Sequence, residues 1–489
     1  MGEKVLEWAY ACLERGLRID VIGYQRGRTF GKNKKRDHGR CYLETAFAFL
    51  LSDLDRHFFQ QLYNTVDTII VGQFVGTEAL AAVGTTGTVI NLLVGFFVGV
   101  ASGATVIISQ YFGANDRENL SKSVHTSMAL AVTGGVVIMV FGIVTARPTM
   151  LAMGVPDDIM DDAVLYMNVY YLGIIGNLIY NIGTGVLRAI GDSRMPLYVL
   201  IVCCLANVVL DLLFVVVFHW GVFGVAFATI LSQLISAVLL MIRLMGTQEA
   251  YRVELRKIRF HKDILKNVVR IGLPAGLQSV MYSFSNILIQ ASINSFGTTA
   301  IAAWAAIGKI DGFIWMVMNA FGIAVTTFAG QNFGARQYDR MKRCTRVGLG
   351  MCLGTIIALS ALLFIFRYQL LMFFTGDAEV VNIGAQFYLV LAPSYFTFVF
   401  IEILSGAIRG AGEALQPMLI TCIGVCGLRV VWILLVVPYW HTMQMVAMNY
   451  PVSWVITAVI FVIYYLRGKW LDRCIKREHD PQHGTATEA

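Results

Sequence analysis

Charged residues are scarce in this chain: they make up 14% of its 489 residues, whereas 57% are hydrophobic. A soluble domain usually carries about 25% charged residues, so this chain lacks the polar surface needed to cover itself in water. Its apolar residues form blocks of about 20 or more, long enough to cross a hydrocarbon core as helices. Apolar and polar residues do not alternate along these blocks, which excludes an outer-membrane barrel. The sequence therefore predicts an all-α polytopic membrane protein.

Motifs for catalysis and metal binding are also missing. The sequence contains no His-Glu-x-x-His, Gly-x-Ser-x-Gly or paired-Asp protease pattern, so we expect neither an enzyme nor a cofactor. The 9 cysteines lack metal or disulfide spacing and are interpreted as small buried side chains. The net charge of +7 lies in short patches between apolar blocks, not along one soluble face, so nucleic acid is not an expected partner. Residues 1–40 lack an apolar segment followed by a cleavage site, so we expect no cleaved signal peptide.

Counting the apolar blocks predicts twelve membrane-spanning helices. The expected spans are 58–75, 86–111, 124–146, 164–187, 195–218, 222–245, 268–294, 303–331, 347–366, 386–408, 417–438 and 447–466. The odd-numbered loops contain only Arg147 and Arg367 as basic residues, whereas the even-numbered loops and the C-terminal segment are rich in Lys and Arg. The positive-inside rule then predicts a multi-pass protein of the plasma (inner) membrane with both termini in the cytoplasm.

An internal repeat divides the spans into two halves. Three separate motifs recur at one displacement of 221 residues, the difference between positions 76 and 297. They pair Gly76, Thr77, Ala79, Ala81 and Ala82 with Gly297, Thr298, Ala300, Ala302 and Ala303; Gln110, Phe112, Gly113 and Ala114 with Gln331, Phe333, Gly334 and Ala335; and Gly185, Arg188, Gly191, Asp192 and Pro196 with Gly406, Arg409, Gly412, Glu413 and Pro417. Such agreement predicts two six-helix lobes related by a parallel internal repeat.

A repeat of six spans is even, so both copies enter the membrane from the same side and are related by an axis along its normal. We expect an atypical basic N-terminal extension (1–56), an N-lobe (57–246), a basic cytoplasmic linker (247–266), a C-lobe (267–466) and a cytoplasmic tail (467–489). The interface of the lobes is the natural place for a substrate, and rocking of the lobes would expose it to each side in turn. Duplication for assembly alone is the alternative.

Two lone acids within the predicted N-lobe spans are the first candidate site. Asp67 of span one and Asp211 of span five have no basic residue in their own spans, so each must be protonated, hydrated or neutralised by a bound cation. Polar residues at helical spacing accompany them: Tyr63 precedes Asp67 by four residues, and Asn207 precedes Asp211 by four. Span four adds Asn181, and span six adds Thr229. These oxygens suit either H⁺ or Na⁺, although helix-to-helix hydrogen bonding is the alternative role.

The C-lobe differs because acids and bases occur together in its spans. Lys309 and Asp311 lie in span eight, Glu402 in span ten and Arg429 in span eleven, so buried ion pairs are one interpretation. The other places Asp311 or Glu402 on a cavity wall that attracts a cationic substrate. Aromatic and methionine side chains could complete an adaptable apolar wall that accepts flat lipophilic cations. The candidates for this wall are Met281, Phe284, Met316 and Tyr395.

Several of these segments together resemble one transporter family. They are Leu62-Tyr63-Asn64-Thr65-Val66-Asp67, the Gly76-Thr77 stretch, Gln110-Tyr111-Phe112-Gly113-Ala114, Gly185-Val186-Leu187-Arg188-Ala189-Ile190-Gly191-Asp192 and their second-half echoes. From about residue 57 to 466 the chain resembles the MATE (multidrug and toxic compound extrusion) family. The resemblance implies a twelve-helix antiporter that exports lipophilic organic cations in exchange for inward H⁺ or Na⁺.

The resemblance also implies a cation site in the first lobe. The matching positions are Asp67, Asn181, Asn207, Asp211 and Thr229, with Tyr63 beside Asp67, and they are also the expected Na⁺ ligands. Another branch of the family relies on carboxylates in helices seven and ten; here span seven has no acid and Glu402 is only a near match. Residues 1–56 depart from the family pattern, because Asp53, Asp55 and Arg56 stand where lipid-facing residues are expected.

The sequence thus predicts a monomeric efflux antiporter in the lipid bilayer, with small lipophilic cations as its partners. One alternative is a flippase for a lipid-linked saccharide or related lipid, which would need a wide basic cavity for phosphate. A channel is another alternative, but it would not require a two-lobe repeat with an acidic pocket. The sequence does not choose between H⁺ and Na⁺.

Overall fold

The computed structural model describes residues 70–478, and every regular element in that range is helical. The N-terminal extension and residues 58–69 of the first predicted span, including Tyr63 and Asp67, lie outside the described residues. What is described of that span is a π-helical turn, η1 (Val71–Val75). The other eleven predicted spans are all observed as helical segments, most of them longer than the apolar block.

The N-lobe helices follow the predicted order along the chain. They are α3 (Thr77–Gly113), α4 (Arg117–Ala152), α5 (Asp157–Ala189), α6 (Arg194–Asp211) continued by the π-helical η2 (Leu212–Val217), and α7 (Gly221–Gly246). The linker to the C-lobe contains one short 3₁₀ turn, η3 (Leu255–Lys257). The predicted second, third, fourth and sixth spans thus lie inside observed helices, and the fifth ends one residue beyond η2.

The C-lobe helices are more often interrupted. They are α8 (Lys262–Asn294), α9 (Thr298–Gly334), α10 (Tyr338–Met372), α11 (Ala378–Leu391) joined through η4 (Ala392–Ser394) to α12 (Tyr395–Gly410), α13 (Leu415–Thr421) joined through the π-helical η5 (Cys422–Gly427) to α14 (Leu428–Leu435), α15 (Met443–Leu466) and α16 (Lys469–Glu478). Predicted spans ten and eleven are therefore each built from two helices and a connecting turn. Ten segments of the described range are long and apolar enough to cross a membrane. Helix α8 is not one of these ten, but it is 33 residues long.

The internal repeat extends to the backbone conformation of the loops. Asn115 and Arg336, which are 221 positions apart, both adopt a left-handed conformation, with φ of 58° and 56°. Gly191 and Gly412 both have a φ of 93°. These turns follow equivalent helices, so equivalent positions of the two halves reverse the chain in the same way.

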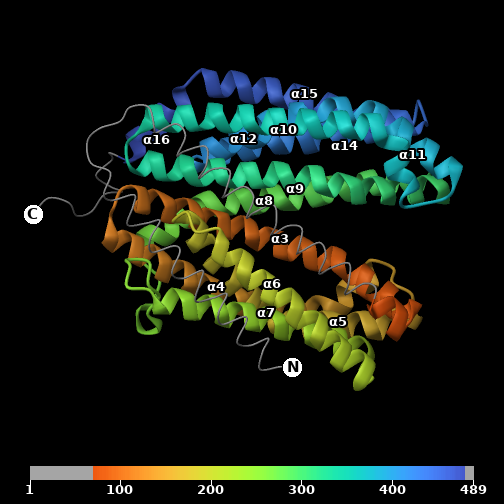
Figure 1. Ribbon diagram of the computed structural model, residues 1–489, viewed down its shortest axis with the longest axis horizontal. Coiled ribbons are helices and arrows are strands. Elements are labelled where there is room, and N and C mark those ends of the chain that lie inside the picture. The colour runs from red at the N-terminus through yellow and green to blue at the C-terminus, as the bar shows by residue number, and fades with distance from the viewer. Residues whose placement is uncertain (1–69, 479–489) are drawn as a thin grey trace, which may run out of the picture. The chain divides into compact units, whose positions relative to one another are not determined.

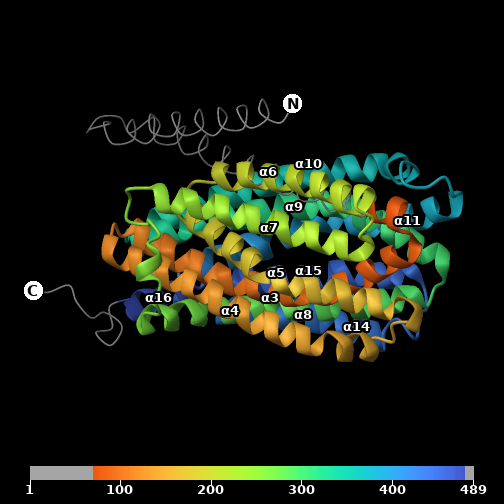
Figure 2. The same cartoon turned by 90° about the horizontal axis from the view of Figure 1, so that it is seen from below.

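Helices α3 and α8 join the two lobes along closely packed glycines. A Cβ atom built on Gly99 would lie 2.5 Å from the Cα of Gly276, and one built on Gly103 would lie 2.5 Å from the backbone nitrogen of Gly272. Only residues without a side chain permit this approach of two helix backbones. Figure 1 shows α3 and α8 between the remaining N-lobe helices below them and the remaining C-lobe helices above them, and Figure 2 shows the same bundle from below.

Candidate functional site

The N-lobe candidate site is centred on the end of α6. Asp211 is the last residue of α6, and both Asp211 and Asn207, one turn earlier, are fully buried. The π-helical η2 begins at the next residue. A π turn inserts an extra residue into a helix and often occurs at functional positions, because it reorients the side chains around it. The chain thus changes its helical geometry directly beside the buried carboxyl group.

The packing of α6 on α7 brings Thr229 to the level of Asn207. The Sγ atom of Cys203 donates to the carbonyl oxygen of Ser232 at 3.2 Å, and a Cβ atom on Gly224 would lie 3.2 Å from that of Phe214. Cys203 thus lies level with Ser232, and Phe214 level with Gly224, on antiparallel neighbours. Counting residues between these two levels sets Asn207 opposite Thr229. Thr229 is also buried and donates its hydroxyl hydrogen to its own helix, at the carbonyl of Val225. Its oxygen lone pairs stay available to accept a hydrogen bond or to bind a cation.

The Asn207 amide has an unsatisfied hydrogen-bonding capacity. Neither its oxygen nor its nitrogen has a hydrogen-bond partner in the part of the chain that the structure describes. A buried polar group left in this state costs about 1–3 kcal/mol of stability. Groups of this kind persist where a ligand, water or ion completes them during function. The amide therefore suits a transient guest beside Asp211.

Asn181 lies further along its helix than the other candidates. Helix α5 runs parallel to α7, with Gly173 against Ile230 and Gly183 against Leu240. This register sets Thr229 level with Leu172, which is nine residues before Asn181. At a rise of about 1.5 Å per residue, Asn181 lies about 13 Å along the helix axis from the level of Thr229. The Asn181 amide donates to the side-chain and backbone oxygens of Asn177, each at 2.9 Å. Asn177 was missed by the sequence analysis, although its spacing of four residues from Asn181 could have identified it.

One of the predicted sodium ligands, Asp67, lies outside the described range. Asn181, Asn207, Asp211 and Thr229 are described, and the last three lie on neighbouring turns of α6 and α7. No group of three or more His, Cys, Asp or Glu side chains suited to a metal occurs within residues 70–478. A sodium site here would therefore depend on neutral oxygens as well as on carboxylates.

Asp311 forms the centre of a different polar cluster in the C-lobe. It is 8% exposed, and its Oδ1 atom accepts hydrogen bonds from the hydroxyls of Tyr395 at 2.6 Å and Tyr388 at 3.1 Å. Tyr395 is completely buried. Two of the C-lobe candidates, Asp311 of α9 and Tyr395 of α12, are thus buried and in direct contact.

Aromatic rings and one arginine surround this cluster. Trp454 packs against Tyr395 and Tyr450 with ring centroids 5.8 and 5.3 Å apart, and the Arg429 guanidinium lies 4.4 Å from the Tyr450 ring centroid. Arg429 thus makes cation–π contacts, whereas Lys309 is exposed. The sequence suggested ion pairs among the charged residues of the C-lobe spans. The ion pair that the structure shows joins Glu402 to Arg409, with 3.9 Å between nitrogen and oxygen.

The remaining C-lobe candidates lie nearer the surface. Met281 and Phe284 of α8 are 37% and 51% exposed, and Met316 of α9 is half-buried. Glu402 faces α9 closely, because a Cβ atom on Gly322 would lie 2.3 Å from its Oε1 atom. The structure therefore separates an accessible apolar group on α8 from the buried carboxyl of Asp311.

The linker between the lobes is bound to α4 by neutral histidines. The Nδ1 atom of His125 lies 2.7 Å from the carbonyl of Ser121, which can only accept, so the Nε2 atom accepts from the Glu254 backbone N–H at 3.0 Å. His261 lies 3.0 Å from the Thr126 hydroxyl. Burial, helped by nearby positive charges, lowers the pKa of His261. The pKa of His261 is thus lower in the folded protein than in the unfolded chain. Docking of the linker on α4 therefore loses stability as the pH falls below the ordinary pKa of histidine.

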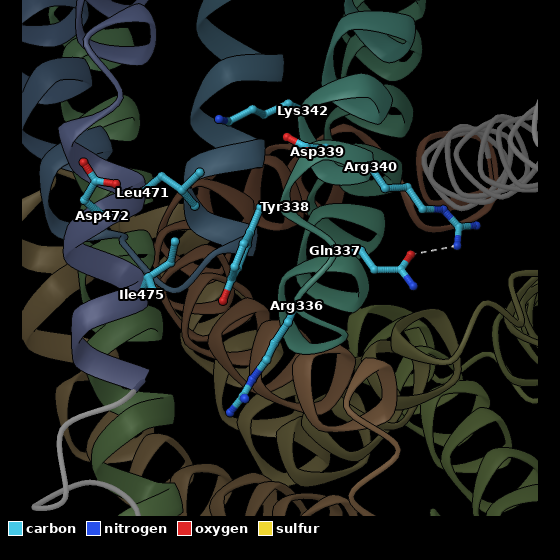
Figure 3. A pocket seen from close by; sticks show the side chains of 9 residues that line it. All are labelled: Arg336, Gln337, Tyr338, Asp339, Arg340, Lys342, Leu471, Asp472 and Ile475. Atoms are coloured by element: carbon cyan, nitrogen blue, oxygen red, sulfur yellow. Dashed lines mark hydrogen bonds between the residues drawn. The ribbon is translucent and has the colours of Figure 1, made fainter.

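A pocket of about 560 Å³ lies away from both clusters, between the start of α10 and the C-terminal helix α16 (Figure 3). Its lining residues are Arg336, Gln337, Tyr338, Asp339, Arg340, Lys342, Leu471, Asp472 and Ile475. Helix α16 is attached to the bundle by buried Trp470 and by an ion pair of 2.7 Å between Arg477 and Glu413. The predicted tail thus includes a packed helix.

Comparison with known proteins identifies the family. The MatE family model matches residues 56–213 and 274–435, one segment in each lobe. The chain belongs to the MATE family. A probable multidrug resistance protein of Bacillus subtilis, YoeA, is 27% identical over 428 residues, which cover 85% of this chain and 92% of the relative. The probable multidrug resistance protein NorM of Thermotoga maritima is 24% identical over 430 residues, with 85% and 90% covered.

The fold of a MATE transporter is also found among solved structures. An outward-facing conformation of a multidrug resistance MATE family transporter of the MOP superfamily matches with a TM-score of 0.80 and 21% identity, over 87% of this chain and 96% of the other. The prediction of a twelve-helix membrane protein with two lobes is confirmed by this likeness together with the family match. This MATE chain is a multi-pass membrane transporter.

Proposed function

We propose that this MATE transporter is a multidrug efflux antiporter that exports lipophilic organic cations in exchange for H⁺ or Na⁺. The names of its relatives, multidrug resistance proteins, support the substrate class. The observation that carries the coupling role is the unsatisfied Asn207 amide beside buried Asp211 in the N-lobe. A group of this composition can accept a positive guest and release it.

The coupling group in this proposal is Asp67 and Asp211, with Asn207, Thr229, Asn181 and Tyr63 as polar neighbours. With both carboxylates ionised, the outward-facing transporter holds a cationic drug. Uptake of H⁺ or Na⁺ neutralises them, favours release of the drug to the outside, and the ion then leaves on the inside. A ligand shifts the two states only by its difference in affinity for them, so ion and drug must compete for the same negative charge.

The C-lobe supplies the substrate surface in this proposal. Met281, Phe284 and Met316 form the adaptable apolar part, and Glu402 contributes negative charge. Asp311 and Tyr395 are buried in contact with each other, so in this proposal they support the packing of α9 and α12 and do not touch the drug. The protein acts as a monomer in the plasma membrane with both termini in the cytoplasm, an orientation supported by the Lys and Arg of its even-numbered loops.

Dye efflux from membrane vesicles tests this function. A pH gradient and a Na⁺ gradient are imposed separately on vesicles that contain the transporter and an ethidium-like dye. We expect one of the two gradients to drive dye movement, and dissipating that gradient to stop it. Ion flux that does not depend on the dye would indicate a channel instead. Movement of a labelled lipid-linked saccharide without dye transport would favour the flippase.

A further inference from the structure

Two glutamines of the repeated motif join the lobes by reciprocal hydrogen bonds. The Nε2 atom of Gln110, in the N-lobe, donates to the carbonyl oxygen of Gly410 in the C-lobe at 2.8 Å. The Nε2 atom of Gln331, in the C-lobe, donates to the carbonyl oxygen of Ala189 in the N-lobe, also at 2.8 Å. Both donors and both acceptors are related by the same displacement of 221 residues. The two bonds therefore form one symmetric arrangement.

The acceptors are the carbonyl groups that helix ends leave unsatisfied. Ala189 is the last residue of α5 and Gly410 the last residue of α12. The final carbonyls of a helix have no partner within it and need one from elsewhere. Each glutamine thus caps a helix of the opposite lobe, and separation of the lobes would expose both helix ends.

The backbones of α3 and α9 touch where the glutamines lie. A Cβ atom on Gly113 would lie 1.9 Å from the carbonyl oxygen of Gln331, and one on Gly334 would lie 1.9 Å from that of Gln110. Side chains at these two positions are therefore excluded while the lobes are together. The repeated Gln-x-x-Gly spacing supplies both the hydrogen bond and the close approach.

The opposite halves of the same helices are not in such contact. Gly87 of α3 and Gly308 of α9 are equivalent by the repeat, and a Cβ atom on either would meet no described atom within 4 Å. In the view of Figure 1, α3 and α9 lie close together near α16 and diverge towards the other end. Among the described residues, α3 and α9 are thus in close backbone contact at the end that carries the basic loops, and the glycines of α3 and α8 form a second contact between the lobes further along the bundle.

We propose that Gln110 and Gln331 form a latch that holds the two lobes together at the basic end and sets the balance between the two access states. This inference rests on the proposed alternating access and adds the groups that govern it. Opening towards the cytoplasm requires both hydrogen bonds to break at once, because the repeat axis relates them. The glutamines are positioning residues, since neither lies among the proposed ion or drug ligands.

Isosteric substitutions test the latch. Gln110→Glu and Gln331→Glu keep the shape of each side chain but remove its amide donor. The matched control is Gln290→Glu, because Gln290 is half-buried and its side chain donates to Asn294 of its own helix at 2.8 Å, not to the opposite lobe. Spin labels on cysteines introduced at Glu118 and Asp339, in a background without native cysteines, report the distance between the lobes at the basic end. Both positions are exposed.

We expect a short distance to dominate before substitution. Each latch substitution should raise the ratio of long to short distances by about 3- to 10-fold, as loss of one net hydrogen bond would. The two substitutions should have similar effects, and the double substitution a larger one. Distances unchanged in both variants, or changed equally by Gln290→Glu, would overturn the latch.

Two features keep this test decisive. If a glutamate variant fails to fold, Gln110→Met and Gln331→Met remove the donor without adding a charge, and the same outcomes apply to them. The distances are measured without dye or ion gradient, so they do not depend on the efflux assay. Failure of dye export would contradict the proposed function, whereas unchanged distances in latch variants that export dye would contradict only the latch.

Discussion

The two lobes share one fold but use their buried carboxyl groups differently. In the C-lobe, two tyrosine hydroxyls donate to Asp311, and aromatic rings pack around them. In the N-lobe, Asp211 lies beside an asparagine whose amide has no partner in the described range. A carboxyl group with its hydrogen bonds already made contributes to a fixed structure. One beside unsatisfied polar groups can respond to an ion, so a duplicated fold can assign structure to one half and coupling to the other.

The largest expected effect distinguishes these two carboxyl groups directly. Asp211→Asn should abolish dye export while leaving the protein in the membrane, because the amide cannot alternate between charged and neutral forms. Asp67→Asn should do the same. Asp311→Asn is the matched control and should lower thermal stability while retaining ion-dependent export. Dye efflux, normalised to the amount of protein in the membrane, measures all three.

The opposite result would reverse the assignment of roles. Undiminished efflux by Asp211→Asn or Asp67→Asn would remove that residue from the coupling site. If Asp311→Asn alone lost its dependence on the ion gradient, coupling would belong to the C-lobe.

A smaller effect should separate stability from transport at one residue. Asn207→Leu removes a buried amide that has no partner among residues 70–478, so the folded protein should become more stable by about 1–3 kcal/mol. Export should fall, because the polar neighbour of Asp211 is lost. Thermal unfolding in detergent and dye efflux in vesicles measure the two quantities on one preparation. A less stable variant would mean that the amide is satisfied in the native protein.

The smallest effect concerns the hydrogen bonds of the C-lobe. Tyr395→Phe removes the 2.6 Å bond to Asp311 and should destabilise the protein by about 0.5–1.5 kcal/mol, the usual net contribution of one hydrogen bond. The ion dependence of export should stay the same. Tyr388→Phe provides a comparison, because its bond to Asp311 is longer at 3.1 Å and its loss should cost less. A changed ion dependence in Tyr395→Phe would show that this cluster takes part in coupling.

Patterns that repeat along the chain allowed the fold to be predicted. Apolar blocks set the helices because a helix satisfies its own backbone groups within a membrane, and eleven predicted spans are observed as helical segments, two of which end before the predicted span does. The breaks in spans ten and eleven were not foreseen. Helices α11 and α12 meet through η4, which contains Pro393, and α13 and α14 meet through η5, which contains Gly424 and Gly427. Hydropathy depends on composition and does not register such changes in helical geometry.

The candidate site could be predicted only in part for the same reason. Spacing along one helix correctly related Asn207 to Asp211, because residues four apart share a face. The distance of Asn181 from the level of Thr229 depends on how α5 packs on α7, which no single segment specifies. The role of Asn177 also became visible only through its bonds to Asn181.

The sequence by itself determined that this chain is a membrane protein of two repeated lobes, since scarcity of charge and a constant displacement are properties of residue order. Only the tertiary structure decided what the repeated residues do. Gln110 and Gln331 are identical in motif, but their partners stand 300 and 142 positions away. Contacts between lobes depend on how helices cross, and the crossing is set by the combined packing of all of them.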